Sequence, residues 1–254
     1  EALTLADRSR LPADLLRANI LSWRARCYRR QRDHEAARED VERALELAEA
    51  MQDTKALGEA YFQASVVAER DGHWVLARTY AERAKAQYEE LTDRLNVGRL
   101  LNNLGGLEFL LGKPEEAVAR LKEAFSVALE LGNDFDAAMA VSSMAQVHLR
   151  TGDPSTAEEQ SRHALRLLGD REDALDEIGN ARLVLGRALL EQERLDDAEE
   201  MFLAAEDAFA QLSSASHKAA AWVAQGDLAQ RRGDDRRAAT FYRRAAEALQ
   251  DLRF

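Results

Sequence analysis

Apolar and polar residues alternate along the chain with the spacing of α-helices. Leucines return every three or four residues over 100–111, and a second apolar stripe runs over 118–129. A period near 3.6 residues is typical of a helix with one buried face. The pattern therefore predicts two amphipathic helices in succession, and similar pairs of stripes continue along the rest of the chain.

A set of three small residues, 12 and then 7 positions apart, occurs six times, at steps of 40 residues with one step of 41. Small residues let helix axes approach closely. We therefore expect the first residue in helix A and the second in helix B, where the pair crosses, and the third where helix B meets the next repeat. The sets are Ala25, Ala37, Ala44; Ser65, Ala77, Ala84; Gly105, Ala117, Ala124; Ala145, Ala157, Ala164; Gly186, Ala198, Ala205; and Gly226, Ala238, Ala245.

The turn between the two helices of a repeat has its own signature. Four repeats carry glycine seven residues after the first small residue, where helix A must end. Arg32 and Glu193 hold this position in the other two, so we expect less regular turns there. The extra residue of the 41-residue step is placed in the acidic stretch 169–177. The glycines are Gly72, Gly112, Gly152 and Gly233, and Pro114 and Pro154 follow two of them at the start of helix B.

This pattern resembles the tetratricopeptide repeat. The period exceeds the usual length of about 34 residues. Repeats near 40 residues are similar to those of kinesin light chain, Pins-type polarity adaptors and the sensor domains of bacterial peptide-responsive regulators. HEAT and armadillo repeats share the period, but helix A has no recurrent proline. The residues that carry the resemblance are Asn103, Leu104, Gly105, Gly112, Ala117, Leu121 and Ala124.

The resemblance implies an all-α fold, a right-handed superhelical solenoid of six helix-turn-helix repeats. We expect a single domain over 1–254. The chain begins with Glu1 rather than Met, and we expect it to be a fragment of a larger protein. The predicted repeats cover 16–50, 56–90, 96–131, 136–168, 177–212 and 217–250.

In this family the A helices line a concave groove. The resemblance implies that groove residues lie three before, one after and four after the first small residue. The same positions of the sixth repeat are Val223, Asp227 and Gln230. The predicted partner-binding residues are Arg26, Phe62, Val66, Asn102, Asn103, Phe109, Met139, Ser142, Gln146, Leu149, Leu183, Arg187 and Leu190.

Several of these residues have two interpretations. The apolar ones, from Phe62 to Leu190, form an exposed binding stripe, or the solenoid curls tightly and they contact one another or a terminal helix. Gly106 allows either a ligand backbone or a second helix to approach closely. The amide of Asn103 either holds a peptide backbone, as in related repeats, or is a satisfied structural group between helices.

The basic residues near the N-terminus also have two interpretations. They bind a carboxylate or phosphate, or they form a solvated face paired with nearby acids such as Asp40. These basic residues are Arg24, Arg26, Arg29, Arg30 and Arg32.

Composition and charge narrow the function. The net charge of −11 argues against direct nucleic-acid binding. No apolar run approaches the ~18 residues of a membrane span, and the single cysteine, Cys27, fits a cytoplasmic protein. The five histidines never pair at metal-ligand spacing. Residues 106–113 depart from a phosphate loop, because five residues separate the glycines and Pro114 replaces the Ser or Thr. We expect no cofactor, metal or catalysis.

The sequence therefore predicts a module that binds a peptide or protein segment in its groove. Residues 245–251 resemble the C-terminal tail of bacterial regulators in which a helix-turn-helix precedes tetratricopeptide repeats. This similarity implies the sensor region of a transcriptional regulator. The alternative is a passive scaffold or oligomerisation module, which includes a homodimer.

Overall fold

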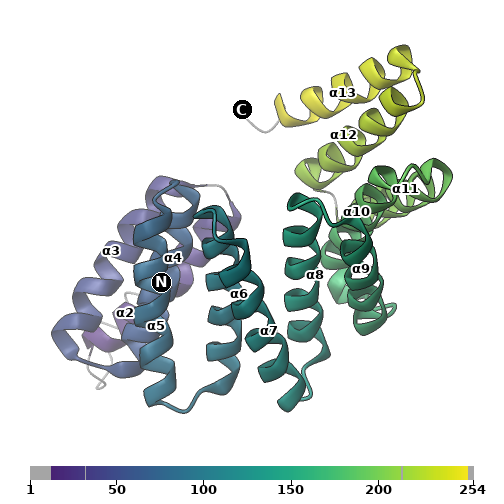
Figure 1. The fold of residues 1–254 in the computed structure, drawn as a ribbon. Coiled ribbons are helices and arrows are strands. Elements are labelled where there is room, and N and C mark those ends of the chain that lie inside the picture. The colour runs from purple at the N-terminus through teal and green to yellow at the C-terminus, as the bar shows by residue number, and fades with distance from the viewer. Residues whose placement is uncertain (1–12, 32, 213, 251–254) are drawn as a thin grey trace. The chain divides into compact units, whose positions relative to one another are not determined.

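A computed structural model describes residues 13–31, 33–212 and 214–250 of the chain. Within these residues the chain forms twelve α-helices, arranged as six successive antiparallel pairs (Figure 1). The predicted all-α fold of six helix-turn-helix repeats is confirmed. The pairs are α2 (Ala13–Arg30) with α3 (His34–Met51), α4 (Thr54–Arg70) with α5 (Trp74–Glu90), α6 (Arg94–Leu110) with α7 (Pro114–Glu130), α8 (Asp134–Arg150) with α9 (Pro154–Leu168), α10 (Leu175–Glu191) with α11 (Leu195–Gln211), and α12 (Ala215–Arg231) with α13 (Asp235–Gln250).

The helices form two compact units that divide between Leu131 and Gly132. Unit 1 holds the first three repeats and unit 2 the last three. Within each unit, helix B of one repeat packs on helix A of the next. The A helices also contact each other, α2 with α4 in unit 1, and α8 with α10 and α10 with α12 in unit 2.

The small residues lie where the sequence places them, and all eighteen are buried. The reason is clearest where helix A carries a glycine. A Cβ atom on Gly186 would lie 2.5 Å from Cε1 of Phe202, and one on Gly226 would lie 2.5 Å from Cε1 of Tyr242. A large side chain of helix B therefore fills the space that a side chain on helix A would need.

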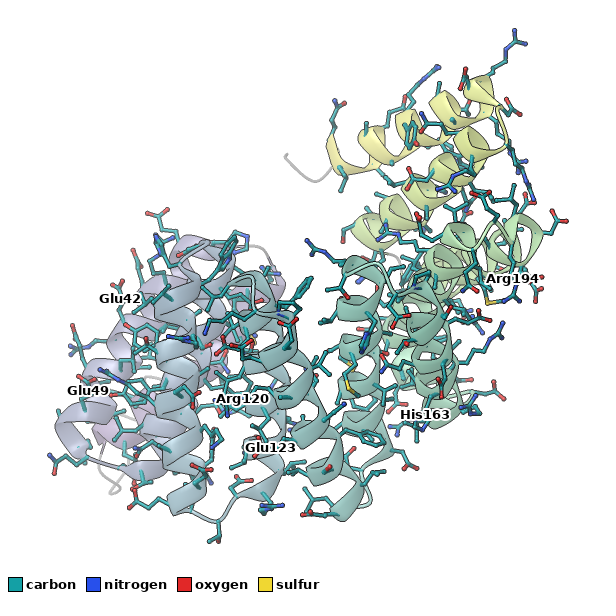
Figure 2. The ribbon with its side chains drawn as sticks, in the orientation of Figure 1. Glu42, Glu49, Arg120, Glu123, His163 and Arg194 are labelled. Carbon is teal, nitrogen blue, oxygen red and sulfur yellow. The ribbon has the colours of Figure 1, made fainter. Side chains whose placement is uncertain are left out.

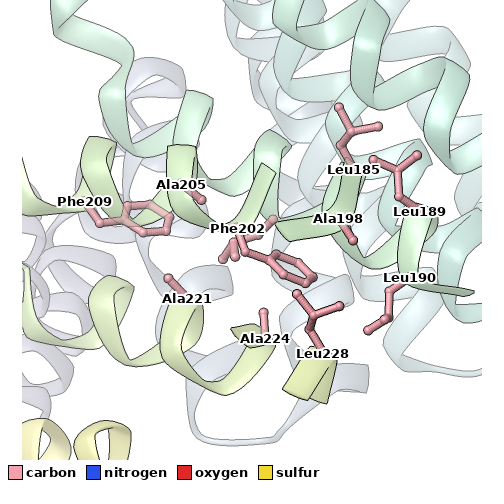
Figure 3. Close-up of a cluster of buried hydrophobic side chains, with 11 residues drawn as sticks. Leu185, Leu189, Leu190, Ala198, Phe202, Ala205, Phe209, Ala221, Ala224 and Leu228 are labelled. Atoms are coloured by element: carbon pink, nitrogen blue, oxygen red, sulfur yellow. The ribbon is translucent and has the colours of Figure 1, made fainter. Parts of the chain in front are cut away.

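Phe202 and Phe209 of α11 form the centre of the core in unit 2 (Figure 3). Both rings are fully buried. They lie between leucines of α10, including Leu185 and Leu189, and the small or apolar residues of α12. Burial of a ring of this size stabilises the fold by roughly 1.5–3 kcal/mol relative to exposure, so α11 anchors the fifth repeat to the sixth.

The turns follow the predicted glycine pattern. Gly72, Gly112, Gly152 and Gly233 have φ between 77° and 84°. Glu193, which holds the same position in the fifth repeat, adopts φ of 59° without being glycine. This is the irregular turn that the sequence predicts, since a left-handed backbone is strained for a residue with a Cβ. Arg32, the other exception, lies outside the described residues.

The helices A begin two or three residues before the predicted repeat ranges. Five helices begin at an Asp or Asn capping residue that the repeat pattern did not predict. The side chains of Asp53, Asp93 and Asn133 each accept a hydrogen bond from the backbone N–H three residues later, as do those of Asp33 and Asp153 at the start of helix B. Such a cap satisfies a backbone donor that has no partner within the helix.

The irregular join between the fourth and fifth repeats contains a short 3₁₀ helix, η1 (Glu172–Ala174). It lies inside the stretch 169–177 where the sequence places the extra residue. At this turn, Arg171 donates two hydrogen bonds to the carboxylate of Asp173, at 3.0 and 2.8 Å. Burial of Ala174 holds the turn against the helices.

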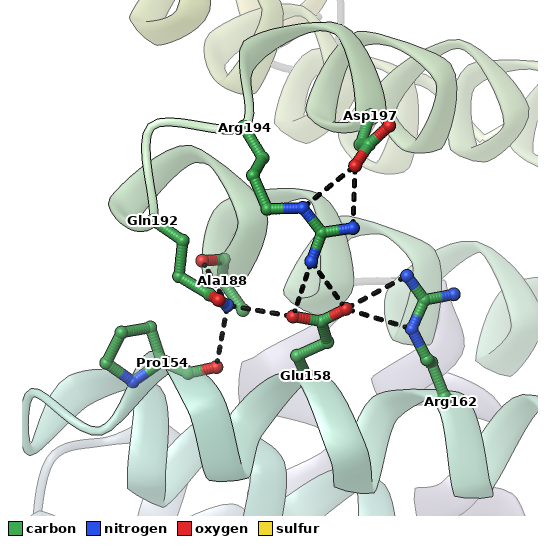
Figure 4. A network of polar contacts seen from close by, with 7 residues as sticks. All are labelled: Pro154, Glu158, Arg162, Ala188, Gln192, Arg194 and Asp197. Atoms are coloured by element: carbon green, nitrogen blue, oxygen red, sulfur yellow. Dashed lines mark hydrogen bonds and ion pairs between the residues drawn. The ribbon is translucent and has the colours of Figure 1, made fainter.

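Charged side chains join successive repeats within each unit at one recurrent position, directly after the small residue of helix B. Arg38 contacts Asp71 at 2.9 Å, and Glu158 contacts Arg194 at 2.9 Å (Figure 4). At the same position, Arg78 lies 3.6 Å from Glu108, and Glu199 lies 2.6 Å from Arg232. The third and sixth repeats hold the uncharged residues Val118 and Ala239 there. We call these contacts the inter-repeat ion pairs. The repeat pattern in the sequence does not predict these ion pairs.

Candidate functional site

The arginines of α2 are held largely by their own neighbours. Arg24 donates two hydrogen bonds to Asp40 of α3, Nε to Oδ2 and Nη2 to Oδ1, both at 2.6 Å. The hydrogen bond from Arg24 to Asp40 raises the pKa of the guanidinium further above its ordinary value. Arg26 is exposed, and its guanidinium lies 5.5 Å from the ring centroid of Trp23. Arg24 therefore follows the paired interpretation of this cluster, while the side chain of Arg30 lies outside the described residues.

The predicted groove residues of unit 1 lie on α4 and α6. Phe62 and Val66 of α4 and Phe109 of α6 are each partly exposed. Glu69 lies one helical turn beyond Val66 and is also partly buried, and burial raises the pKa of its carboxyl despite the nearby positive charge of Arg70. The apolar residues of unit 1 thus keep part of their surface open rather than disappearing into the core.

Asn102, Asn103 and Gly106 share one face of α6, and we call this set the α6 notch. The Oδ1 atom of Asn102 is buried and has no hydrogen-bond partner among the described residues. The partly exposed amide of Asn103 also forms no hydrogen bond within the described part of the chain. A Cβ atom on Gly106 would meet no heavy atom within 4 Å. Gly106 therefore has no packing contact that explains it, and Asn103 forms no structural hydrogen bond among the described residues.

The predicted residues of unit 2 differ in exposure. Met139, Ser142 and Leu149 of α8 are partly exposed, and Gln146 is exposed. On α10, Arg187 is exposed, whereas Leu183 and Leu190 are each only 6% exposed and belong to the core around Phe202. The apolar stripe is therefore narrower in the fifth repeat than the sequence suggests, because α10 packs between α8 and α12.

A cavity of about 830 Å³ nevertheless opens on the A-helix face of unit 2. We call it the unit 2 cavity. It brings together groove positions of three successive repeats, and Gly152 and Pro154, near the turn between α8 and α9, also line it. The groove positions that line it are Leu149 of the fourth repeat, Arg187 and Leu190 of the fifth, and Asp227 and Gln230 of the sixth.

The charged side chains around this cavity differ in whether they have a partner. Arg231 lies 3.6 Å from Glu191 and also pairs with Glu193. Tyr242 donates a hydrogen bond from Oη to Asp227 Oδ1 at 2.8 Å. Arg187 forms no ion pair or hydrogen bond within the described part of the chain. The guanidinium of Arg187 is thus free to meet an anionic group that enters the cavity.

Two further cavities, each of about 570 Å³, lie on the helix-B side of unit 1, where the sequence predicted no site. One has an apolar floor that includes Val67 and Tyr80. The other is charged and is lined by Arg120 of α7, which is labelled in Figure 2. Arg120 donates a hydrogen bond to Glu82 of α5 at 2.9 Å. No sequence signal marks either one, because both open between B helices of neighbouring repeats.

Among the described residues, no group of three or more His, Cys, Asp or Glu side chains is placed to hold a metal ion. None of the helices in this part of the chain is both long and apolar enough to cross a membrane.

These features define a helical-repeat module with open surface on its A helices. A family model of the tetratricopeptide repeat matches residues 56–130 and 96–170, and a second model of the same repeat matches residues 18–51. Together the matches cover more than half of the chain. The chain belongs to the tetratricopeptide repeat family, whose modules bind protein or peptide segments. No curated protein sequence matches it.

Solved structures with the same fold include several bacterial proteins. A Rap protein complexed with competence and sporulation factor has a TM-score of 0.75 and 16% identity, with 98% of this chain and 79% of that chain covered. NprR in complex with its cognate peptide NprX has a TM-score of 0.73 and 12% identity, with 92% of this chain and 67% of that chain covered. BtubC from P. vanneervenii has a TM-score of 0.67 and 19% identity, with 87% of this chain and 91% of that chain covered. Likeness at these identities shows the fold.

Proposed function

We propose that this chain binds an extended peptide or protein segment on its A-helix faces, without catalysis, and acts as the regulatory sensor region of a bacterial transcriptional regulator. The α6 notch is the observation that carries the binding proposal. It combines an open glycine with two amide side chains that have no partner in the described part of the chain.

Gly106 supports the proposal because it is costly for the helix. A glycine inside a helix is about 1 kcal/mol less favourable than alanine. Its neighbour Gly105 has a packing reason, since a Cβ there would clash with Leu121 of α7. Gly106 has none, because the space above it is open. A ligand backbone that approaches α6 closely would explain why no side chain stands there.

Asn102 and Asn103 support the proposal through their hydrogen-bonding capacity. A buried polar atom without a partner destabilises a protein by roughly 1–3 kcal/mol. A peptide N–H that bonds to Oδ1 once the Asn102 amide has turned toward the surface would remove this penalty. An amide offers both a donor and an acceptor, so Asn103 can bond to both backbone groups of one peptide residue. Bound peptide would thus gain from groups that the free protein leaves unpaired.

The sensor role rests on similarity and on the tail sequence. Rap and NprR structures that share this fold are described as complexes with a factor or a cognate peptide. Residues 245–251 resemble the tail of regulators that place a helix-turn-helix before such repeats. Binding that slightly changes the rotation between repeats adds up along a solenoid and can reposition a fused domain.

Peptide selection tests the binding role. A phage-displayed library of random dodecapeptides is panned on the full chain, and labelled hits are titrated by fluorescence anisotropy. We expect Gly106→Leu to weaken hits that bind at the notch by tenfold or more, because the new side chain covers both amides while the open space keeps the fold intact. The control is Ala119→Leu, at an exposed position of α7.

Two results would contradict this proposal. One is a library that yields no specific peptide. The other is a set of hits whose affinity is the same for Gly106→Leu, Ala119→Leu and the unchanged chain. The sensor part is checked separately by small-angle X-ray scattering with and without a saturating hit. A change in the scattering profile is expected, and identical profiles would remove the conformational mechanism.

One observation favours the scaffold alternative. Trp74, Val75 and Leu76 at the start of α5 are 41%, 62% and 44% exposed. Three consecutive exposed apolar residues are typical of a contact surface. Sedimentation velocity over a hundredfold range of concentration tests it. A dimer that Val75→Lys dissociates would support this alternative, and a concentration-independent monomer would count against it.

A further inference from the structure

A row of three polar side chains crosses the A-helix face of unit 2. Gln146 of α8, Arg187 of α10 and Asp227 of α12 hold the same position in successive repeats, directly after the first small residue. The next groove position along the same helices holds Leu149, Leu190 and Gln230. Arg187 and Asp227 both line the unit 2 cavity, and so do Leu149 and Leu190.

The row presents opposite charges on neighbouring helices. Arg187 has no partner among the described residues, and it is more than 4.0 Å from Asp227, since no ion pair joins them. Asp227 is oriented by the hydroxyl of Tyr242, which contacts only its Oδ1 atom. Its second carboxylate oxygen remains available. Arg187 is thus available to an anionic group, and one oxygen of Asp227 to a cationic group. The cavity is also lined by the apolar side chains of Leu149 and Leu190 and by the charged Arg150, Glu191 and Arg231.

The spacing of this pair fits a particular peptide conformation. Packed helix axes lie about 8–10 Å apart. A polyproline II chain rises about 3.1 Å per residue with three residues per turn, so residues i and i+3 point to the same side about 9 Å apart. In a β-strand, side chains at i and i+3 point to opposite sides. A polyproline II segment can thus meet Arg187 and Asp227 at once.

We infer that the unit 2 cavity recognises a peptide segment with an acidic and a basic side chain three residues apart and an apolar side chain between them. This inference deepens the proposed function and rests on it. The acidic side chain meets Arg187, whose planar guanidinium suits a carboxylate. The basic side chain meets Asp227. The apolar side chain packs on the edge of Leu190, which lies on α10 together with Arg187.

The test uses labelled nonapeptides and the full chain. One peptide carries Glu and Lys three residues apart with Leu between them, a second carries the reversed order, and a third replaces both charges by Gln. We expect at least one charged peptide to bind tenfold or more tightly than the neutral one by fluorescence anisotropy. Arg187→Glu should abolish this preference. The matched control is Arg243→Glu, an equal charge change at an exposed residue of α13, which should leave binding unchanged.

A charge exchange sharpens the test. On Arg187→Glu, a peptide with Lys in place of its Glu should recover most of the lost affinity, because the new pair has opposite charges again. Equal binding of charged and neutral peptides, or equal effects of Arg187→Glu and Arg243→Glu, would overturn the inference. The proposed function would still stand in that case if library peptides bind at the α6 notch. Absence of any bound peptide, from the library or the designed set, would sink both.

Discussion

Gly105 of α6 is in direct contact with Leu121 of α7: a Cβ atom on the glycine would lie 2.5 Å from Leu121 Cγ and 3.2 Å from the backbone oxygen of Ala117. The helix pair of the third repeat therefore closes only around a residue without a side chain. Its neighbour Gly106 faces open space. The two consecutive glycines of α6 thus differ: packing against α7 requires Gly105, whereas no packing contact requires Gly106.

Gly105→Ala should destabilise the protein. Overpacking of a close contact typically costs about 1–3 kcal/mol, and the better helix propensity of alanine returns about 1 kcal/mol of this. We expect a net loss of up to about 2 kcal/mol in the free energy of unfolding, measured by urea denaturation followed by circular dichroism. An unchanged unfolding midpoint would show that Leu121 moves aside freely.

Gly106→Ala should have the opposite effect. The added methyl group meets no atom within 4 Å, so only the helix propensity changes. We expect a gain of about 0.5–1 kcal/mol in the free energy of unfolding, in the same urea experiment. Destabilisation by this variant would mean that Gly106 has a packing role, and it would weaken the case for the α6 notch as a ligand site.

The pair of Arg24 and Asp40 should respond asymmetrically to truncation. The Asp40 side chain is 7% exposed, whereas that of Arg24 is 42% exposed. Arg24→Leu leaves a buried carboxylate without its donor, and we expect a loss of about 2–3 kcal/mol. Asp40→Leu leaves a guanidinium that reaches water, and we expect about 1 kcal/mol or less. A double-mutant cycle measured by thermal and urea denaturation checks the order. Equal losses would contradict this burial argument.

Acid should weaken the contact around Glu158. Burial alone would raise the pKa of this carboxyl, but hydrogen bonds from Gln192, Arg162 and Arg194 outweigh it, and the pKa is lowered (Figure 4). A lowered pKa in the folded state means that the contact stabilises the protein above the unfolded pKa of about 4.3. This stability is lost as the pH falls through the lower folded value.

Glu158→Gln should therefore lose about 1–2 kcal/mol of unfolding free energy at pH 7, and less at pH 3. Urea denaturation at several pH values measures both quantities. Glu159→Gln is the matched control, since Glu159 is exposed and has no partner among the described residues. A Glu158→Gln deficit that stays constant from pH 7 to pH 3 would show that the carboxylate charge is not what stabilises this contact.

The repeat architecture could be predicted because it depends on residue size at fixed spacing. The eighteen small positions and the four turn glycines need no partner to be recognised, since sterics alone dictates them. Even the irregular turn at Glu193 followed from the absence of glycine. The capping residues are local as well, since each Asp or Asn accepts a hydrogen bond from the backbone N–H three residues later.

The candidate site could be predicted only in part. Helical register placed Leu149, Arg187 and Leu190 on one face correctly enough that all three line the unit 2 cavity. It could not show that Leu183 is buried, because burial depends on how closely α10 packs between α8 and α12. Nor could it show that Asn103 is unpaired or that Arg24 is engaged. These facts depend on side-chain partners from other helices.

The two units differ in which helix contributes the positive charge to the inter-repeat ion pairs. In unit 1 helix B contributes the arginine, as in Arg38 with Asp71, whereas in unit 2 it contributes the acid, as in Glu158 with Arg194. Gene duplication that copied the second repeat behind the fourth would set Glu158 against Asp71, two carboxylates at one junction. A junction between repeats of the two classes would therefore lose an ion pair and gain a like-charge contact, which disfavours such an arrangement of the array.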